Sequence, residues 1–141
     1  MAFHIVVIDD DPALQEFYTL LLENEGYRVT IPPLFDPSPT SIVELHPDLI
    51  ILDLLIGGQQ RGWSFLQTFT NDPQTATLPI LLVTALPTTT FETKWKEFIQ
   101  KQNISIIMKP FDIEKLLNTI RSFLPTPEPP PTESAYNDTG F

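Results

Sequence analysis

The chain has 141 residues, no cysteine, a hydrophobic fraction of 42% and a formal net charge of −10. This length fits a single domain, and the lack of cysteine excludes a disulfide-stapled secreted scaffold. The negative charge disfavours binding to nucleic acid or to an anionic membrane, and it favours cationic partners and metal ions. No apolar stretch reaches the roughly 20 residues of a membrane span and no signal peptide opens the chain, so we expect a cytoplasmic protein.

The first half of the chain predicts two strands, each followed by a helix. The apolar run Ile5–Ile8 is the first strand, and the helix after it begins at the N-cap Asp11 and ends at Gly26. A second strand is expected over residues 27–31 and a short helix over residues 40–46.

The second half continues the alternation. Further apolar strands are expected over residues 49–52, 80–83 and 104–108. Trp63 and Trp95 fit the apolar stripes of two helices, the second of which opens with a capping box of Thr89 and Glu92; a last helix begins at Asp112. Strands that alternate with helices over short connections predict an α/β fold, a five-stranded parallel sheet doubly wound with helices on both faces.

The sequence changes in kind after Leu124. Residues 125–141 are rich in proline and too poor in apolar side chains to offset the entropy of ordering them, which predicts a flexible tail behind a domain of residues 1–124. Pro127 and Pro130 match the P-x-x-P spacing of polyproline ligands.

Polar side chains follow four of the predicted strands. Asp9 and Asp10 follow the first, Asp53 the third, Thr84 the fourth and Lys109 the fifth. In a flavodoxin-like sheet of order 2-1-3-4-5, ligands bind beyond the carboxyl ends of the first and third strands. These side chains are therefore expected to form one site.

The chemistry of that site follows from its charges. Three converging carboxylates repel one another, and a hard divalent cation with oxygen ligands relieves the repulsion, which favours Mg²⁺, with Mn²⁺ as the alternative. Such a cation accepts a phosphoryl oxygen as a further ligand, and Thr84 and Lys109 can stabilise negative charge on a transferring phosphoryl group. Asp53, alone at the end of its strand, is the expected nucleophile.

Four sequence motifs at these strand ends resemble the receiver domain of two-component response regulators. They are DDDP at 9–12, PDLIILD at 47–53, PILLVTA at 79–85 and KPF at 109–111, and the resemblance spans residues 3 to about 124. It implies that Asp53 accepts phosphate from a sensor histidine kinase or a phosphotransfer protein. The implied Mg²⁺ ligands are Asp10, Asp53 and the backbone carbonyl of Leu55, with Asp9 bound through water.

The resemblance also implies that Thr84 and Lys109 bind the phosphoryl oxygens and that the Lys109–Pro110 peptide bond is cis. Two features depart from the family pattern. The loop over residues 57–62 lacks the usual proline and is one residue longer, and Ile106 stands where the family commonly has an aromatic residue that moves inward on activation.

The expected function is that of a stand-alone receiver, not an enzyme, which signals by contact with an unknown protein target. Neither nucleic acid nor membrane is an expected partner, and a homodimer is a possible assembly. One alternative is a receiver-like interaction module that works without phosphorylation. Another is a phosphatase, because the first strand also resembles the D-x-D strand of haloacid dehalogenase-like enzymes, with Asp9 attacking and Asp11 as acid and base.

Overall fold

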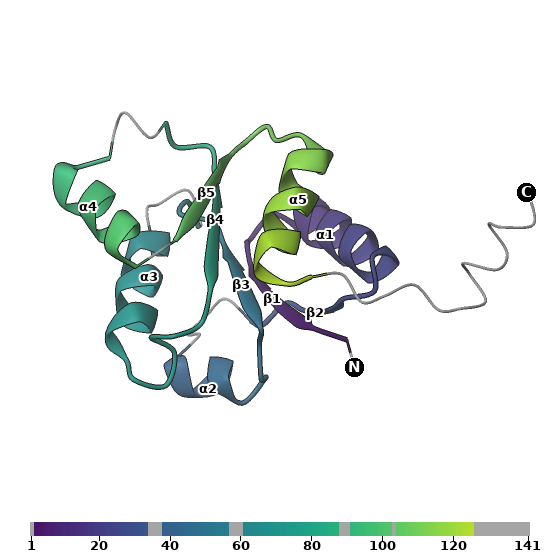
Figure 1. The fold of residues 1–141 in the computed structure, drawn as a ribbon, viewed down its shortest axis with the longest axis horizontal. Helices are drawn as coiled ribbons and strands as arrows, with labels where there is room; N and C mark the ends of the chain where they lie inside the picture. The colour runs from purple at the N-terminus through teal and green to yellow at the C-terminus, as the bar shows by residue number, and fades with distance from the viewer. Residues whose placement is uncertain (1, 34–37, 57–60, 88–90, 103, 126–141) are drawn as a thin grey trace, which may run out of the picture.

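The computed structural model describes residues 2–33, 38–56, 61–87, 91–102 and 104–125. All strand pairs are parallel, and the sheet has the predicted order β2-β1-β3-β4-β5 (Figure 1). The strands are β1 (His4–Ile8), β2 (Arg28–Thr30), β3 (Leu49–Leu52), β4 (Ile80–Thr84) and β5 (Ser105–Met108). The helices are α1 (Pro12–Asn24), α2 (Pro39–Val43), α3 (Arg61–Asn71), α4 (Thr93–Lys101) and α5 (Ile113–Phe123).

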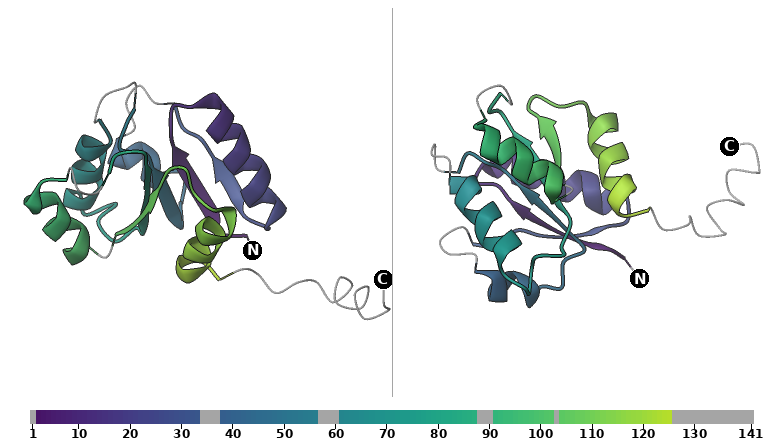
Figure 2. Two further views of the ribbon diagram at one scale, coloured as in Figure 1. Left: turned by 90° about the horizontal axis from the view of Figure 1, so that it is seen from above. Right: turned by 60° about the vertical axis from the view of Figure 1, so that its left-hand side comes forward.

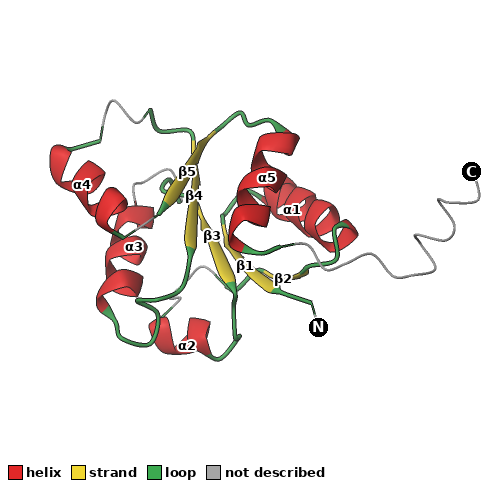
Figure 3. Cartoon of the chain, viewed as in Figure 1, coloured by secondary structure: helices red, strands yellow, loops and turns green. Residues whose placement is uncertain are grey.

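Helices cover both faces of the sheet, as the alternation of elements predicted. One face packs against α1 and α5, and the other packs against α2, α3 and α4 (Figures 2 and 3). Alternate strand residues point to opposite faces, so Ile5 and Val7 join one core whereas Val6 and Ile8 join the other. Because both faces are covered, the strands are apolar throughout, which explains the continuous hydrophobic runs.

The first helix begins and ends where the sequence predicted. The Asp11 side chain accepts a hydrogen bond from Ala13 N at 2.9 Å, and Gly26 follows the helix with a φ of 94°. β2 is shorter than the expected 27–31 at both ends, because Ile31 lies beyond the last paired residue, Thr30, and Tyr27 belongs to the connection from α1. Its backbone N–H donates to Leu22 O and its hydroxyl donates to Leu124 O.

Two other helix boundaries differ from the prediction. α2 begins at Pro39 and ends at Val43, before His46, whose φ of 53° is incompatible with a right-handed helix. α4 begins at Thr93 with Glu92 at its N-cap, so the predicted start at Thr89 is wrong; Thr89 itself lies outside the described residues.

The last helix begins as predicted, since Asp112 caps α5 by accepting a hydrogen bond from Glu114 N. The predicted tail lies outside the described residues from position 126 onward. None of the helices in the described part of the chain combines the length and the apolar character that crossing a membrane requires.

Candidate functional site

The acidic residues meet at the carboxyl edge of the sheet. The register pairs Ile8 with Leu52, so the residues that follow β1 and β3 leave the sheet side by side, and Asp53 N donates to Ile8 O at 3.0 Å. Carboxylate oxygens of Asp9, Asp10 and Asp53 lie within 4.8 Å of one another. The predicted convergence of the three acids is therefore present.

Lys109 reaches this cluster from the end of β5. Its Nζ lies 2.9 Å from Asp53 Oδ2 and 3.2 Å from Asp9 Oδ2. Burial alone lowers the pKa of Lys109, but the hydrogen bond to Asp53 and the negative charges of Asp9 and Asp53 outweigh burial and raise that pKa above its usual value. The lysine is thus held in its charged form, and the Lys109–Pro110 bond is cis, as expected.

Asp9 is the most enclosed of the three acids. Burial raises the pKa of its carboxyl and the charge of Asp53 adds to the rise, while the hydrogen bond from Asp11 N and the charge of Lys109 oppose it. Gln15 also donates from Nε2 to the Asp9 backbone carbonyl at 2.6 Å. These contacts fix the start of the loop that carries Asp9 and Asp10.

Asp53 is held by its own loop and by the first turn of α3. Its Oδ1 accepts a hydrogen bond from Leu55 N at 2.9 Å. Gly62 N donates to Leu54 O, and a Cβ atom at Gly62 would stand 2.3 Å from Asp53 O and 2.4 Å from Leu54 Cα. Only glycine allows this approach, so the start of α3 rests directly on the backbone of Asp53.

Thr84 occupies the predicted place at the end of β4, fully buried. Its carbonyl accepts a hydrogen bond from Lys109 N at 2.8 Å, which ties the ends of β4 and β5 together. Its hydroxyl accepts from Leu86 N at 3.1 Å, and a hydroxyl that accepts in this way keeps its own hydrogen for another acceptor. Leu55 and Leu86 are both half-buried beside these loops.

The sequence reasoning missed three residues that shape the site. Gly62 carried a signal in the glycine-rich stretch, but its contact with Asp53 did not show there, and nothing marked Gln15. The third is Tyr18, which is fully buried with its ring stacked 6.2 Å from that of Phe111. No described residue accepts a hydrogen bond from its hydroxyl, and burial, followed by the charges of Asp9 and Asp53, raises its pKa.

The three carboxylates fit a hard divalent cation. All of their donor atoms are oxygens, which Mg²⁺ prefers, and the oxygens are close enough to share one ion. Asp9 and Asp53 are buried whereas Asp10 is exposed, so the cluster has a closed side within the sheet and an open side toward solvent.

The family model for the response regulator receiver domain matches residues 5–121. The chain belongs to this family. The receiver is 34% identical over 120 residues to the DNA-binding dual master transcriptional regulator RpaA of Synechocystis. That match covers 85% of this chain and 48% of RpaA, so the receiver spans about half the length of this relative.

Solved structures show the same fold. Chemotaxis protein CheY4 of Vibrio cholerae aligns with a TM-score of 0.66 at 20% identity, over 88% of this chain and 100% of CheY4. The receiver domain of the sensor histidine kinase PA1611 of Pseudomonas aeruginosa, which has a magnesium ion coordinated in its active site cleft, aligns with a TM-score of 0.63 at 20% identity, over 87% and 98% of the two chains.

Proposed function

We propose that this receiver accepts a phosphoryl group on Asp53 from a sensor histidine kinase or a phosphotransfer protein, in a reaction that requires Mg²⁺. The observation that carries the proposal is the position of Asp53. It follows β3, the strand that lies between β1 and β4. Asp9 and Asp10 follow β1, so the Asp53 carboxylate has acids on one side and the ammonium of Lys109 against it.

The chemistry is a nucleophilic displacement at phosphorus. An oxygen of the Asp53 carboxylate forms a bond to the phosphorus of a phosphohistidine while the phosphorus–nitrogen bond breaks and the imidazole leaves with the electron pair, taking up a proton. Lys109, now paired with Asp53, would turn its ammonium to the new phosphoryl oxygens, and the Thr84 hydroxyl would donate its hydrogen to another of them. Both groups stabilise charge that develops during transfer.

The metal ligands in this proposal are the Asp10 and Asp53 carboxylates and the backbone carbonyl of Leu55, with Asp9 acting through water. A bound Mg²⁺ supplies positive charge that offsets the carboxylates and the phosphoryl oxygens. Support comes from the oxygen-only donor set and from the magnesium in the PA1611 receiver. Mn²⁺ satisfies the same ligands and is the alternative cation.

The phosphorylated receiver is proposed to signal by contact with another protein. In this role the receiver is a phosphoacceptor and not an enzyme acting on other molecules, and phosphate shifts a two-state equilibrium that a target reads. RpaA is named as a DNA-binding regulator and is longer than this chain. The stand-alone arrangement, the lack of a nucleic-acid partner and the state of assembly stay predictions from the sequence.

The decisive experiment is incubation with acetyl phosphate and Mg²⁺ followed by intact mass. One acid-stable, base-labile phosphoryl group is expected, and Asp53→Asn abolishes it. Asp48→Asn is the matched control, because Asp48 stands before β3 at the opposite end of the same strand, where its carboxylate accepts a hydrogen bond from His4 N. Loss in Asp9→Asn with uptake retained in Asp53→Asn would support the phosphatase alternative, and no uptake from acetyl phosphate or from a kinase would support the phosphorylation-independent module.

A further inference from the structure

The hydroxyl of Tyr18 is a polar group inside the core that α1 and α5 form with the sheet. The side chain is fully buried, and no described residue accepts a hydrogen bond from its hydroxyl. Nearly all buried polar groups in folded proteins have a partner, either a protein atom or an ordered water molecule. Phenylalanine would fill the same space without leaving a donor unpaired, so the hydroxyl of Tyr18 calls for a physical explanation.

The acidic site lies on the same face of the sheet as Tyr18. Side chains alternate between the two faces along a strand. The strand residues two positions before Asp9, Asp53 and Lys109 all belong to the core cluster that contains Tyr18. They are Val7, Ile51 and Ile107. The contacts of Lys109 with both carboxylates keep the three charged groups together beyond that cluster.

The direction of α1 brings the Tyr18 hydroxyl toward the acidic site. The helix begins directly after its N-cap Asp11, at the carboxyl edge, and Tyr18 lies seven residues further along, a rise of about 10 Å. Helical side chains point back toward the N-terminus of their helix, so the Tyr18 ring projects toward the acidic edge. The ring also stacks on that of Phe111, two residues beyond Lys109, with centroids 6.2 Å apart.

The charges of the site act on this hydroxyl. Burial is the largest cause of the raised pKa of Tyr18, followed by the charge of Asp9 and then by that of Asp53. The stronger effect of Asp9 indicates that its carboxylate is the principal neighbouring charge. Neither carboxylate accepts a hydrogen bond directly from the hydroxyl, and polar groups that face each other beyond hydrogen-bond distance are commonly bridged by a water molecule.

The Asp9 carboxylate has capacity for another donor. Its Oδ1 accepts a hydrogen bond from Asp11 N at 2.9 Å, and its Oδ2 accepts one from Lys109 Nζ at 3.2 Å. A carboxylate offers about four lone-pair positions, so Asp9 can accept about two further hydrogen bonds. In the proposed function a metal-bound water uses one of them, which leaves one for a donor on the side of Tyr18.

We propose that one buried water molecule bridges the Tyr18 hydroxyl and the Asp9 carboxylate, and that Tyr18 is a positioning residue of the metal site. The hydroxyl donates its hydrogen to the water, and the water donates to Asp9. When Lys109 turns to the phosphoryl oxygens, Asp9 loses the donor on its Oδ2, but the bridging water stays and keeps the carboxylate oriented. The effect on Mg²⁺ rests on the proposed function, whereas the water bridge itself does not.

A high-resolution crystal structure of the full chain tests the geometry. The expected result is a water molecule about 3 Å or less from both Tyr18 Oη and a carboxylate oxygen of Asp9. A Tyr18 hydroxyl that donates directly to a backbone carbonyl, or that has no water beside it, would overturn the proposal.

Calorimetric titration with Mg²⁺ tests the positioning role. Tyr18→Phe removes the hydroxyl and keeps the ring, and it should weaken Mg²⁺ binding about tenfold, the lower end of the loss expected when an outer partner of a metal ligand is removed. Tyr27→Phe is the matched control and should leave the affinity unchanged, because the Tyr27 hydroxyl is also buried but donates to Leu124 O, before β2 and at the opposite edge of the sheet. Equal affinities of Tyr18→Phe and the unmodified protein would refute the positioning role.

A double-mutant cycle separates action through Asp9 from a general loosening of the site. In the background of Asp9→Ala, the further change Tyr18→Phe should alter Mg²⁺ affinity by less than about twofold, since the group that it positions is absent. An undiminished tenfold loss in that background would mean that Tyr18 acts on another group and would overturn the bridge. An unmodified protein that binds no Mg²⁺ would count against the proposed function, while the crystal structure would still decide the water bridge.

Discussion

The ammonium nitrogen of Lys109 lies 2.9 Å from Asp53 Oδ2, although the two residues are 56 positions apart in the chain. The same nitrogen contacts Asp9 at 3.2 Å, so one positive charge serves two carboxylates while Asp10 adds a third negative charge. The cluster keeps an excess of negative charge, and the stability of the domain should therefore depend on Lys109 and on divalent cations.

Replacing Lys109 by Met should lower the free energy of unfolding by about 2 kcal/mol in the absence of divalent cations, because two enclosed carboxylates lose their partner. Added Mg²⁺ should raise the free energy of unfolding of Lys109→Met by more than it raises that of the unmodified protein. Urea unfolding with and without Mg²⁺ measures both quantities. Lys115→Met on the exposed face of α5 is the control, and an equal loss in both variants would contradict the assigned role of Lys109.

Gly62→Ala should disturb the backbone at Asp53 directly. A Cβ at this position meets Asp53 O and Leu54 Cα well inside van der Waals contact, so the backbone of Asp53 has to move, at about 1–3 kcal/mol. We expect slower phosphorylation by acetyl phosphate together with a lower melting temperature.

Gly26→Ala separates these two effects. Gly26 has a φ of 94° and open space around it, so the substitution costs about 1 kcal/mol of backbone strain and touches nothing at the site. Its phosphorylation rate should match that of the unmodified protein. A similar slowing in both glycine variants would attribute the effect to general destabilisation.

Asp10 and Asp11 should behave differently toward Mg²⁺ although they are adjacent. Asp10→Ala removes an oxygen from the cluster and should weaken Mg²⁺ binding about tenfold or more, as seen by calorimetry. Asp11→Ala removes the cap of α1, which costs about 1 kcal/mol of stability and should leave Mg²⁺ affinity nearly unchanged. Equal losses of affinity would mean that Asp11 is also a ligand.

Tyr18→Phe should make the protein more resistant to alkali. Burial and the nearby charges of Asp9 and Asp53 raise the pKa of the Tyr18 hydroxyl, so the folded state holds its proton while the unfolded chain ionises near pH 10. The Tyr18 hydroxyl makes its full contribution to the free energy of unfolding below about pH 10. Above that pH the contribution is lost by about 1.4 kcal/mol per pH unit. Urea unfolding between pH 9 and about pH 11 should give a shallower slope for Tyr18→Phe; identical slopes would refute the assignment.

The lifetime of the phosphoryl group should depend on Leu55 and Leu86. Both side chains are apolar and stand two positions beyond Asp53 and Thr84, where they cannot orient an attacking water by hydrogen bonding. Leu55→Asn combined with Leu86→Glu should speed dephosphorylation about tenfold, which corresponds to about 1.4 kcal/mol of barrier. Rapid loss of phosphate from the unmodified protein, unchanged in the double variant, would indicate that water enters by another route.

The sheet and the acidic site could be predicted because each depends on a local pattern. Strands buried on both faces are continuous apolar runs, and Asp9, Asp53 and Thr84 stand directly at their carboxyl ends. Strand order then brings together residues that are far apart in sequence, so the site followed once the order was assumed.

The start of α4 could not be predicted in this way. Thr89 and Glu92 form a local capping signature, but Phe91 is buried against Trp63, with ring centroids 4.9 Å apart, and Glu92 has an extended ψ of 150°. A tertiary contact thus outweighs the local signal and delays the helix to Thr93. The approach of Gly62 to Asp53 is likewise a distance between elements, which no spacing in the sequence records.

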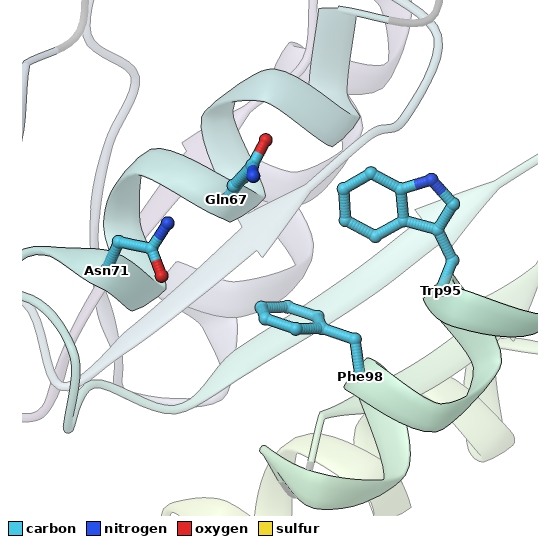
Figure 4. A pocket seen from close by; sticks show the side chains of 4 residues that line it. All are labelled: Gln67, Asn71, Trp95 and Phe98. Carbon is cyan, nitrogen blue, oxygen red and sulfur yellow. The ribbon is translucent and has the colours of Figure 1, made fainter.

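The contact between Gly62 and Asp53 connects the first turn of α3 to the acidic site. The helix starts on the backbone of Asp53 and ends, about 16 Å away, at Asn71, which lines a pocket with Gln67, Trp95 and Phe98 (Figure 4). Backbone hydrogen bonds link the turns of this helix of 11 residues, so a displacement of its first turn would be carried toward its last. If phosphate on Asp53 changes the affinity of that pocket for a ligand, reciprocity requires that the bound ligand change the free energy of the phosphorylated state by the same amount.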